Sequence, residues 1–140
     1  MFLLDTNVIS ETSRKRADPQ VVAWLRGLRP GQWRVSVVTA YELELGVAGL
    51  RRRDESQALV LERWLSHARE GYAERMLPVT AEIARRCAAI QVPNRRQLTD
   101  ALIAATALHH GLTVATRNEK DFDIPGLRVV NPFAEAVGAR

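Results

Sequence analysis

The chain has 140 residues, and a chain of this length buries roughly 68–70% of its unfolded surface, so residues 1–140 are expected to form a single domain. Its 20 lysines and arginines outnumber 16 aspartates and glutamates, which permits a nucleic-acid partner without identifying one. The single cysteine excludes an intramolecular disulfide and favours a cytoplasmic location, and no apolar run approaches the ~20 residues that span a bilayer, so no membrane partner is expected.

Short apolar runs alternate with helical patterns along the chain. The first run, residues 2–4, shows no polar alternation and predicts a strand buried on both faces. Further strands are predicted at 33–38, 76–79, 112–116 and 127–130, and Pro78 favours an edge position for the run at 76–79. Helices are predicted at 8–13, 19–28, 39–53, 55–67, 80–90 and 98–108. This order favours an α/β fold, a three-layer α/β/α sandwich with a mainly parallel sheet.

Two of these helices have features that bear on a functional site. Residues 98–108 are apolar almost all round, which indicates a central, buried helix, and Gly111 stands where a helix commonly ends. The helix at 39–53 is expected to begin at Thr39 and to close in three arginines, whose charge suits a helix C-terminus. Within it, Gly46 fits either close packing or the approach of a substrate.

Four acids follow predicted strands or begin the helices after them: Asp5, Glu42, Asp100 and Asp121. Ligands of open α/β sheets bind beyond the carboxyl ends of the strands, where these acids are expected. Each acid also has a structural interpretation. Glu42 stands three residues after Thr39, so its carboxylate could complete a capping box. Asp100 could be stabilised by a helix N-terminus, and Asp121 could be a solvated loop residue.

Carboxylates that converge in one cleft repel one another, and without a cation at least one should take up a proton. A divalent metal ion resolves this repulsion. The histidines, His67, His109 and His110, lack an acid or cysteine at zinc-ligand spacing, so hard oxygen ligands point to Mg²⁺ or Mn²⁺. A carboxylate cluster with one or two such ions can direct water at a phosphodiester.

Four segments carry a resemblance to a known family: residues 3–10, 39–46, 100–107 and 115–122. They look like the four motifs of the PIN-domain nucleases. Their order and spacing are similar to the toxin branch of that family, the VapC and FitB-like proteins of type II toxin–antitoxin systems. The resemblance covers nearly the whole chain, and each motif pairs an acid with a recognisable setting.

This resemblance implies a metal-dependent endoribonuclease that hydrolyses RNA with Mg²⁺-activated water and is inhibited by a cognate antitoxin. It also implies a homodimer that contacts DNA only through the antitoxin complex. Asp5, Glu42 and Asp100 match the metal-binding acids of the family, and the small polar residues around the metal are matched by Thr6, Asn7 and Thr116.

The fourth acid has two candidates. Asp121 is the preferred catalytic and metal-binding acid, and Asn118 stands closer to the position used in some relatives, where its carbonyl oxygen could bind the metal. If neither binds tightly, a single metal ion held by Asp5 and Asp100 is the expected resting state.

Basic residues close to the motifs could grip RNA around an acidic cleft: Arg14, Lys15, Arg16, Arg95, Arg96 and Arg117. Each of them equally fits a solvated loop charge. Trp24, Trp64 and Tyr41 are candidates for an apolar surface that an antitoxin helix or a second subunit covers, although such aromatic residues are more often core.

Two other functions remain open at this point. A haloacid-dehalogenase-type phosphohydrolase also places an acid after its first strand, but its Asp-x-Asp pattern is not matched because Asn7 follows Asp5 by two residues. A non-catalytic PIN-like module that binds RNA or protein is the second. Such a module should hold RNA equally well in chelator, whereas a nuclease should need Mg²⁺ or Mn²⁺ for turnover.

Overall fold

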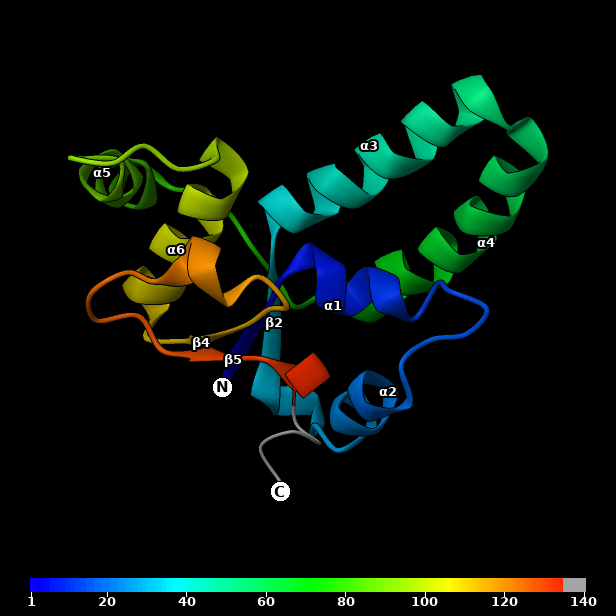
Figure 1. Cartoon of the computed structure of the whole chain (residues 1–140), viewed down its shortest axis with the longest axis horizontal. Helices are drawn as coiled ribbons and strands as arrows, with labels where there is room; N and C mark the ends of the chain where they lie inside the picture. Colours follow the sequence, from blue (N-terminus) through cyan, green and yellow to red (C-terminus); the bar gives the residue numbers. More distant parts are fainter. Residues whose placement is uncertain (135–140) are drawn as a thin grey trace.

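The computed structural model describes residues 1–134, in which five strands form one sheet in the order β3-β2-β1-β4-β5 (Figure 1). Every neighbouring pair is parallel, which confirms the predicted α/β class. The strand next to Pro78, β3, lies at an edge as predicted. The strands are β1 (Phe2–Leu4), β2 (Trp33–Ser36), β3 (Met76–Leu77), β4 (Thr113–Ala115) and β5 (Val129–Val130).

Helices cover both faces of this sheet (Figure 1). Helices α3 and α4 pack against each other as a hairpin that extends away from the sheet. None of the helices in residues 1–134 has the length and apolar character needed to cross a membrane. The helices are α1 (Thr6–Glu11), α2 (Pro19–Arg26), α3 (Val37–Arg53), α4 (Glu55–Tyr72), α5 (Ala81–Ile90) and α6 (Leu98–His110), with short 3₁₀ turns η1 (Pro30–Gln32), η2 (Glu119–Phe122) and η3 (Pro132–Ala134).

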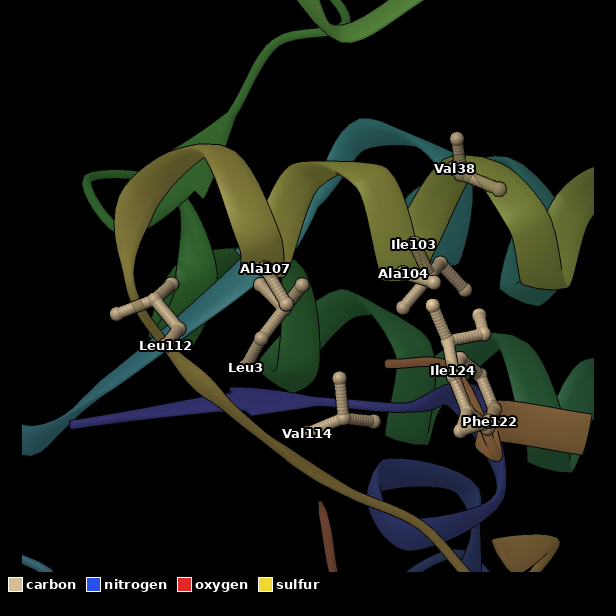
Figure 2. Packing of buried hydrophobic residues seen from close by; sticks show 9 residues of the cluster. All are labelled: Leu3, Val38, Ile103, Ala104, Ala107, Leu112, Val114, Phe122 and Ile124. Carbon is tan, nitrogen blue, oxygen red and sulfur yellow. The ribbon is translucent and has the colours of Figure 1, made fainter. Parts of the chain in front are cut away.

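The central strand β1 is buried on both faces, as its apolar run predicts. On one face, Leu3 packs with Ile103 and Ala107 of α6 (Figure 2). On the other face, Leu4 packs with Val8 of α1 and Val21 of α2. Because successive side chains of a strand point to opposite faces, these two contacts produce the three layers.

Two helices begin earlier than the sequence predicts. Helix α1 begins at Thr6 instead of residue 8, because the Asp5 carboxylate caps it by accepting the Thr6 N–H. Helix α3 begins at Val37 because the hydroxyl of Ser36 accepts the Val38 N–H at 3.0 Å, so the predicted start at Thr39 is wrong. Thr39 instead lies within α3, and its side chain is fully buried.

The central helix α6 has the expected character, and six of its residues are buried: Ala101, Ile103, Ala104, Ala105, Thr106 and Ala107. It ends at Gly111, which adopts the left-handed conformation with φ of 67°. Helix α4 runs to Tyr72, past the predicted end at residue 67, because the buried Tyr72 continues its packing against α3. The prediction of one domain over residues 1–140 includes 135–140, which lie outside the described residues.

Two glycine substitutions should change the stability of the fold in opposite directions. Gly111→Ala should cost about 1 kcal/mol of unfolding free energy, because an L side chain strains the left-handed conformation although its Cβ would meet no atom within 4 Å. Gly49→Ala, inside α3 and equally open, should stabilise the protein by about 0.4–1 kcal/mol. Urea unfolding of both variants measures these changes, and a Gly111→Ala protein as stable as the parent would contradict the assignment.

Candidate active site

The carboxyl ends of the strands form one edge of the sheet, and a shallow cleft of about 250 Å³ lies there. It brings together residues that are far apart in the chain. Of the four predicted acids, three line this cleft. The lining residues are Asp5, Thr6, Asn7, Ser10, Glu42, Asp100 and Asn118.

Asp5 is the most firmly held of these acids, with only 3% of its surface exposed. Its backbone N–H donates to the Ala115 carbonyl at 2.9 Å, which extends the pairing of β1 with β4. One carboxylate oxygen accepts the Thr6 N–H at 2.8 Å, and the other accepts the Thr116 hydroxyl at 2.7 Å. The carboxylate therefore has a fixed orientation before any ligand binds.

Asn7 connects the two chain segments that meet at Asp5. Its side-chain Nδ2 donates to Asp5 at 3.2 Å and to the Thr116 hydroxyl oxygen at 3.3 Å. Its Oδ1 accepts the backbone N–H of Arg117 at 3.1 Å. Asn7 thus fixes the start of the loop after β4 against the N-terminal end of α1.

Glu42 reaches the cleft from α3. The Thr6 hydroxyl donates to its Oε1 at 2.5 Å. The capping-box interpretation of Glu42 is wrong, because Ser36 rather than Thr39 caps the helix. Glu44, two residues further along α3, does not line the cleft but pairs with Arg69 of α4 at 2.6 Å.

The electrostatics of the cleft are unfavourable for three or four negative charges. Burial raises the pKa of Asp5, the Thr116 and Thr6 hydrogen bonds oppose this shift, and the charges of Glu42 and Asp121 add to it. Burial, followed by the charges of the other acids, raises the pKa of Asp100 to about 6. Within residues 1–134 none of the cleft acids forms an ion pair.

The two candidates for the fourth position differ in placement. Asn118 lines the cleft, and its backbone N–H donates to the Thr116 hydroxyl oxygen at 3.0 Å. Asp121 is an exposed residue of the η2 turn and does not line the cleft, but its charge contributes to the raised pKa of both Asp5 and Asp100. Asp121 is therefore within electrostatic reach of the other acids.

The comparison with protein families matches residues 2–126 to the PIN domain. The chain belongs to the PIN-domain family. This membership also decides against the haloacid-dehalogenase interpretation.

Among known proteins, this PIN domain is similar to toxin FitB of Neisseria gonorrhoeae, with 38% identity over 138 residues, which cover 95% of this chain and 99% of FitB. It is also similar to the VapC ribonuclease Y4jK of Sinorhizobium fredii, with 31% identity over 141 residues, which cover 97% and 100% of the two chains. The structure of FitAB bound to an IR36 DNA fragment superposes with a TM-score of 0.83 at 36% identity, covering 95% of this chain and 96% of that one.

The basic residues predicted to grip RNA lie outside the lining of the cleft. Arg14 forms an ion pair with Glu11 at 3.6 Å. Arg96 donates to the Asp123 carbonyl at 3.1 Å, and the guanidinium of Arg117 lies over the Phe133 ring, 4.5 Å from its centroid. Lys15, Arg16 and Arg95 are exposed loop residues.

The three aromatic residues predicted to form an apolar surface have different environments in this PIN domain. Trp24 is half-buried and packs edge-to-face on Phe2. Trp64 lines an apolar groove of about 360 Å³ between α1, α2 and α4, together with Leu28 and Trp33. Tyr41, next to Glu42, is 57% exposed.

Sequence reasoning missed two residues near the site. Ser10 lines the cleft one turn after Thr6, and the three- to four-residue spacing of a helix face was the signal that could have found it. Glu11 is buried and accepts the Asp18 N–H at 2.8 Å, which ties the end of α1 to the start of α2. No short-range pattern in the sequence indicates this contact.

The metal-free PIN domain should lose stability as the pH rises from about 4 to about 7. Because the pKa of Asp100 is raised from 3.8 to about 6, the folded state keeps a proton that the unfolded chain has released in this range. The loss should be on the order of 1–2 kcal/mol, since water screens the half-buried group.

Urea unfolding in chelator at several pH values measures this dependence. Asp100→Asn should weaken this dependence and leave the part due to Asp5, whose pKa is also raised, whereas Asp123→Asn, a control aspartate outside the cleft, should retain it in full. An Asp100→Asn protein with the parental pH dependence would show that the cleft charges do not oppose folding.

Proposed function

We propose that this PIN domain is a metal-dependent endoribonuclease that acts as the toxin of a type II toxin–antitoxin pair. The observation that carries the proposal is the cleft in which Asp5, Glu42 and Asp100 share one small volume without an ion-pair partner in residues 1–134. The similarity to proteins named toxin FitB and VapC ribonuclease supports the same function.

The donor set of the cleft fits Mg²⁺, with Mn²⁺ as a substitute. Its donors are carboxylate and amide oxygens, which hard divalent cations prefer. Within residues 1–134 no three acidic, histidine or cysteine side chains are arranged to hold a metal ion by themselves. Mg²⁺ does not require such a group of three, because it usually keeps several waters and binds through one or two carboxylates. Asp5 and Asp100 are the proposed primary ligands.

When bound, the cation would neutralise phosphate charge and supply an activated water. The chain's own residues prepare the site for it. Thr116 and Asn7 orient the Asp5 carboxylate, and the Thr6 hydroxyl orients Glu42 toward the same cleft. Because these hydrogen bonds exist before binding, little reorganisation would be needed when substrate arrives.

Partners follow from the same proposal. The substrate would be an RNA strand, and a cognate antitoxin would block the site until it is removed. The groove beside Trp64 offers apolar surface for such a protein partner. We also propose that the protein is a cytoplasmic homodimer that contacts DNA only through the antitoxin complex. The structure of FitAB bound to an IR36 DNA fragment supports DNA binding by such a complex, by analogy.

Replacement of either central aspartate should abolish cleavage. Asp5→Asn and Asp100→Asn keep side-chain shape but remove a metal-binding charge, so the rate should fall by roughly 100-fold or more, beyond the effect of losing a supporting residue. Cleavage of total cellular RNA by antitoxin-free protein in Mg²⁺, Mn²⁺ or chelator measures this.

The control for that experiment is Glu44→Gln, which removes a nearby α3 acid that does not line the cleft and should leave cleavage at the parental rate. Retained cleavage by Asp5→Asn would sink the assignment. RNA binding without cleavage in any metal, unchanged by the two aspartate variants, would identify a non-catalytic binding module instead.

The fourth position can be assigned by comparing two variants. Asp121→Asn should raise the Mg²⁺ concentration for half-maximal cleavage by about tenfold, because its charge acts on both Asp5 and Asp100. Asn118→Ala should have the smaller effect. A metal titration of both variants decides, and a larger shift for Asn118→Ala would transfer the role to its carbonyl oxygen.

A further inference from the structure

Arg117 is tied to the acidic cleft through its backbone. It directly follows Thr116, whose hydroxyl donates to Asp5, and its own N–H donates to the Asn7 side chain at 3.1 Å. These contacts place the backbone of Arg117 beside two residues that line the cleft, Asp5 and Asn7. The start of its side chain is therefore fixed relative to the reacting centre.

The other end of the side chain lies on an aromatic ring. The guanidinium carbon of Arg117 is 4.5 Å from the centroid of Phe133. Arg117 is exposed, and within residues 1–134 no hydrogen bond or ion pair engages its guanidinium. Stacking uses the flat face of the guanidinium and leaves its N–H edges available for a bidentate anion such as phosphate.

Phe133 is itself held in place. Its backbone N–H donates to the Asn131 side chain at 2.9 Å, and its ring packs against the hydrophobic cluster of Leu4, Val8 and Val21. Leu4 precedes Asp5 in the chain. The ring therefore packs on the same buried cluster as Leu4, the residue next to Asp5.

We propose that Phe133 is a positioning residue that holds Arg117 as a phosphate-binding cation beside the acidic cleft. This rests on the proposed function, in which RNA enters the cleft. The structure distinguishes Arg117 from two other predicted RNA contacts, because Arg14 is paired with Glu11 and Arg96 donates to a backbone carbonyl. Arg117 combines a fixed backbone, a stacked guanidinium and unused donors.

The competing explanation is that Phe133 only fixes the chain near its C-terminal end by packing. A packing role would lower stability when the ring is removed but would not change how strongly RNA binding depends on salt. A phosphate contact would change that dependence, because each contact to a single strand contributes about 0.7 to the slope of log K against log salt concentration.

The test measures binding of a short single-stranded RNA to the full chain in chelator over a range of salt concentrations. Arg117→Ala should weaken binding about tenfold and lower the slope by about 0.7. Phe133→Leu should weaken binding by about 2–5-fold, the value of an exposed cation–π contact, and lower the slope in part. Phe133→Trp keeps an aromatic ring beneath the guanidinium and should bind the RNA as tightly as the parent does.

Two controls are matched to these variants. Arg128→Ala removes an exposed arginine just before β5, at the amino end of that strand and away from the cleft at the carboxyl ends. Its side chain donates to the Gly111 carbonyl. Phe2→Leu removes a ring from the same hydrophobic cluster without a contact to Arg117. Both variants should keep the parental slope of log K against log salt concentration. Phe2→Leu should lower the melting temperature much as Phe133→Leu does.

The proposal is overturned if Phe133→Leu loses stability but keeps the parental affinity and slope, or if Arg117→Ala behaves like Arg128→Ala. A parent protein that does not bind the RNA would overturn it as well. Cleavage of the same RNA in Mg²⁺ is measured in parallel. Loss of binding in the variants of a parent that never cleaves would support the positioning role and reject the nuclease.

Discussion

The burial of one carboxylate constrains the rest of this structure. Asp5 lies at the end of the central strand, almost without contact to water, and within residues 1–134 three hydrogen-bond donors stabilise its charge, from Thr6, Asn7 and Thr116. These donors come from the start of α1 and the end of β4. Asp5 thus caps a helix, joins two strands and carries a charge whose cost a bound cation would offset.

The fold brings the other acids to this point through two helices. Because α3 begins at Val37, Glu42 lies in its second turn, where the Thr6 hydroxyl orients it. Asp100 lies near the N-terminal end of α6, and the packing of this helix against Leu3 fixes its position relative to Asp5. In the sheet, parallel pairing of every strand places the carboxyl ends at one edge. The acids therefore converge although their charges repel.

The sequence was most informative where local chemistry determines structure. The apolar run at β1 and the helix end at Gly111 were predicted correctly, and so was the convergence of Asp5, Glu42 and Asp100, although the fourth predicted acid, Asp121, does not line the cleft. The start of α3 was missed because Ser36 and Thr39 compete as caps, and the buried β2 end favours Ser36. The stack of Phe133 on Arg117 joins residues far apart in the chain, which no local pattern reveals.

We propose that these mutually repelling carboxylates form a divalent cation site. Binding of Mn²⁺ to the isolated protein, followed by the electron paramagnetic resonance of the free ion, tests it without reference to any RNA. We expect saturable binding that is lost in Asp5→Asn and Asp100→Asn and kept in Glu44→Gln. Saturable binding that survives both aspartate substitutions, or its absence in the parent at millimolar Mn²⁺, would contradict it.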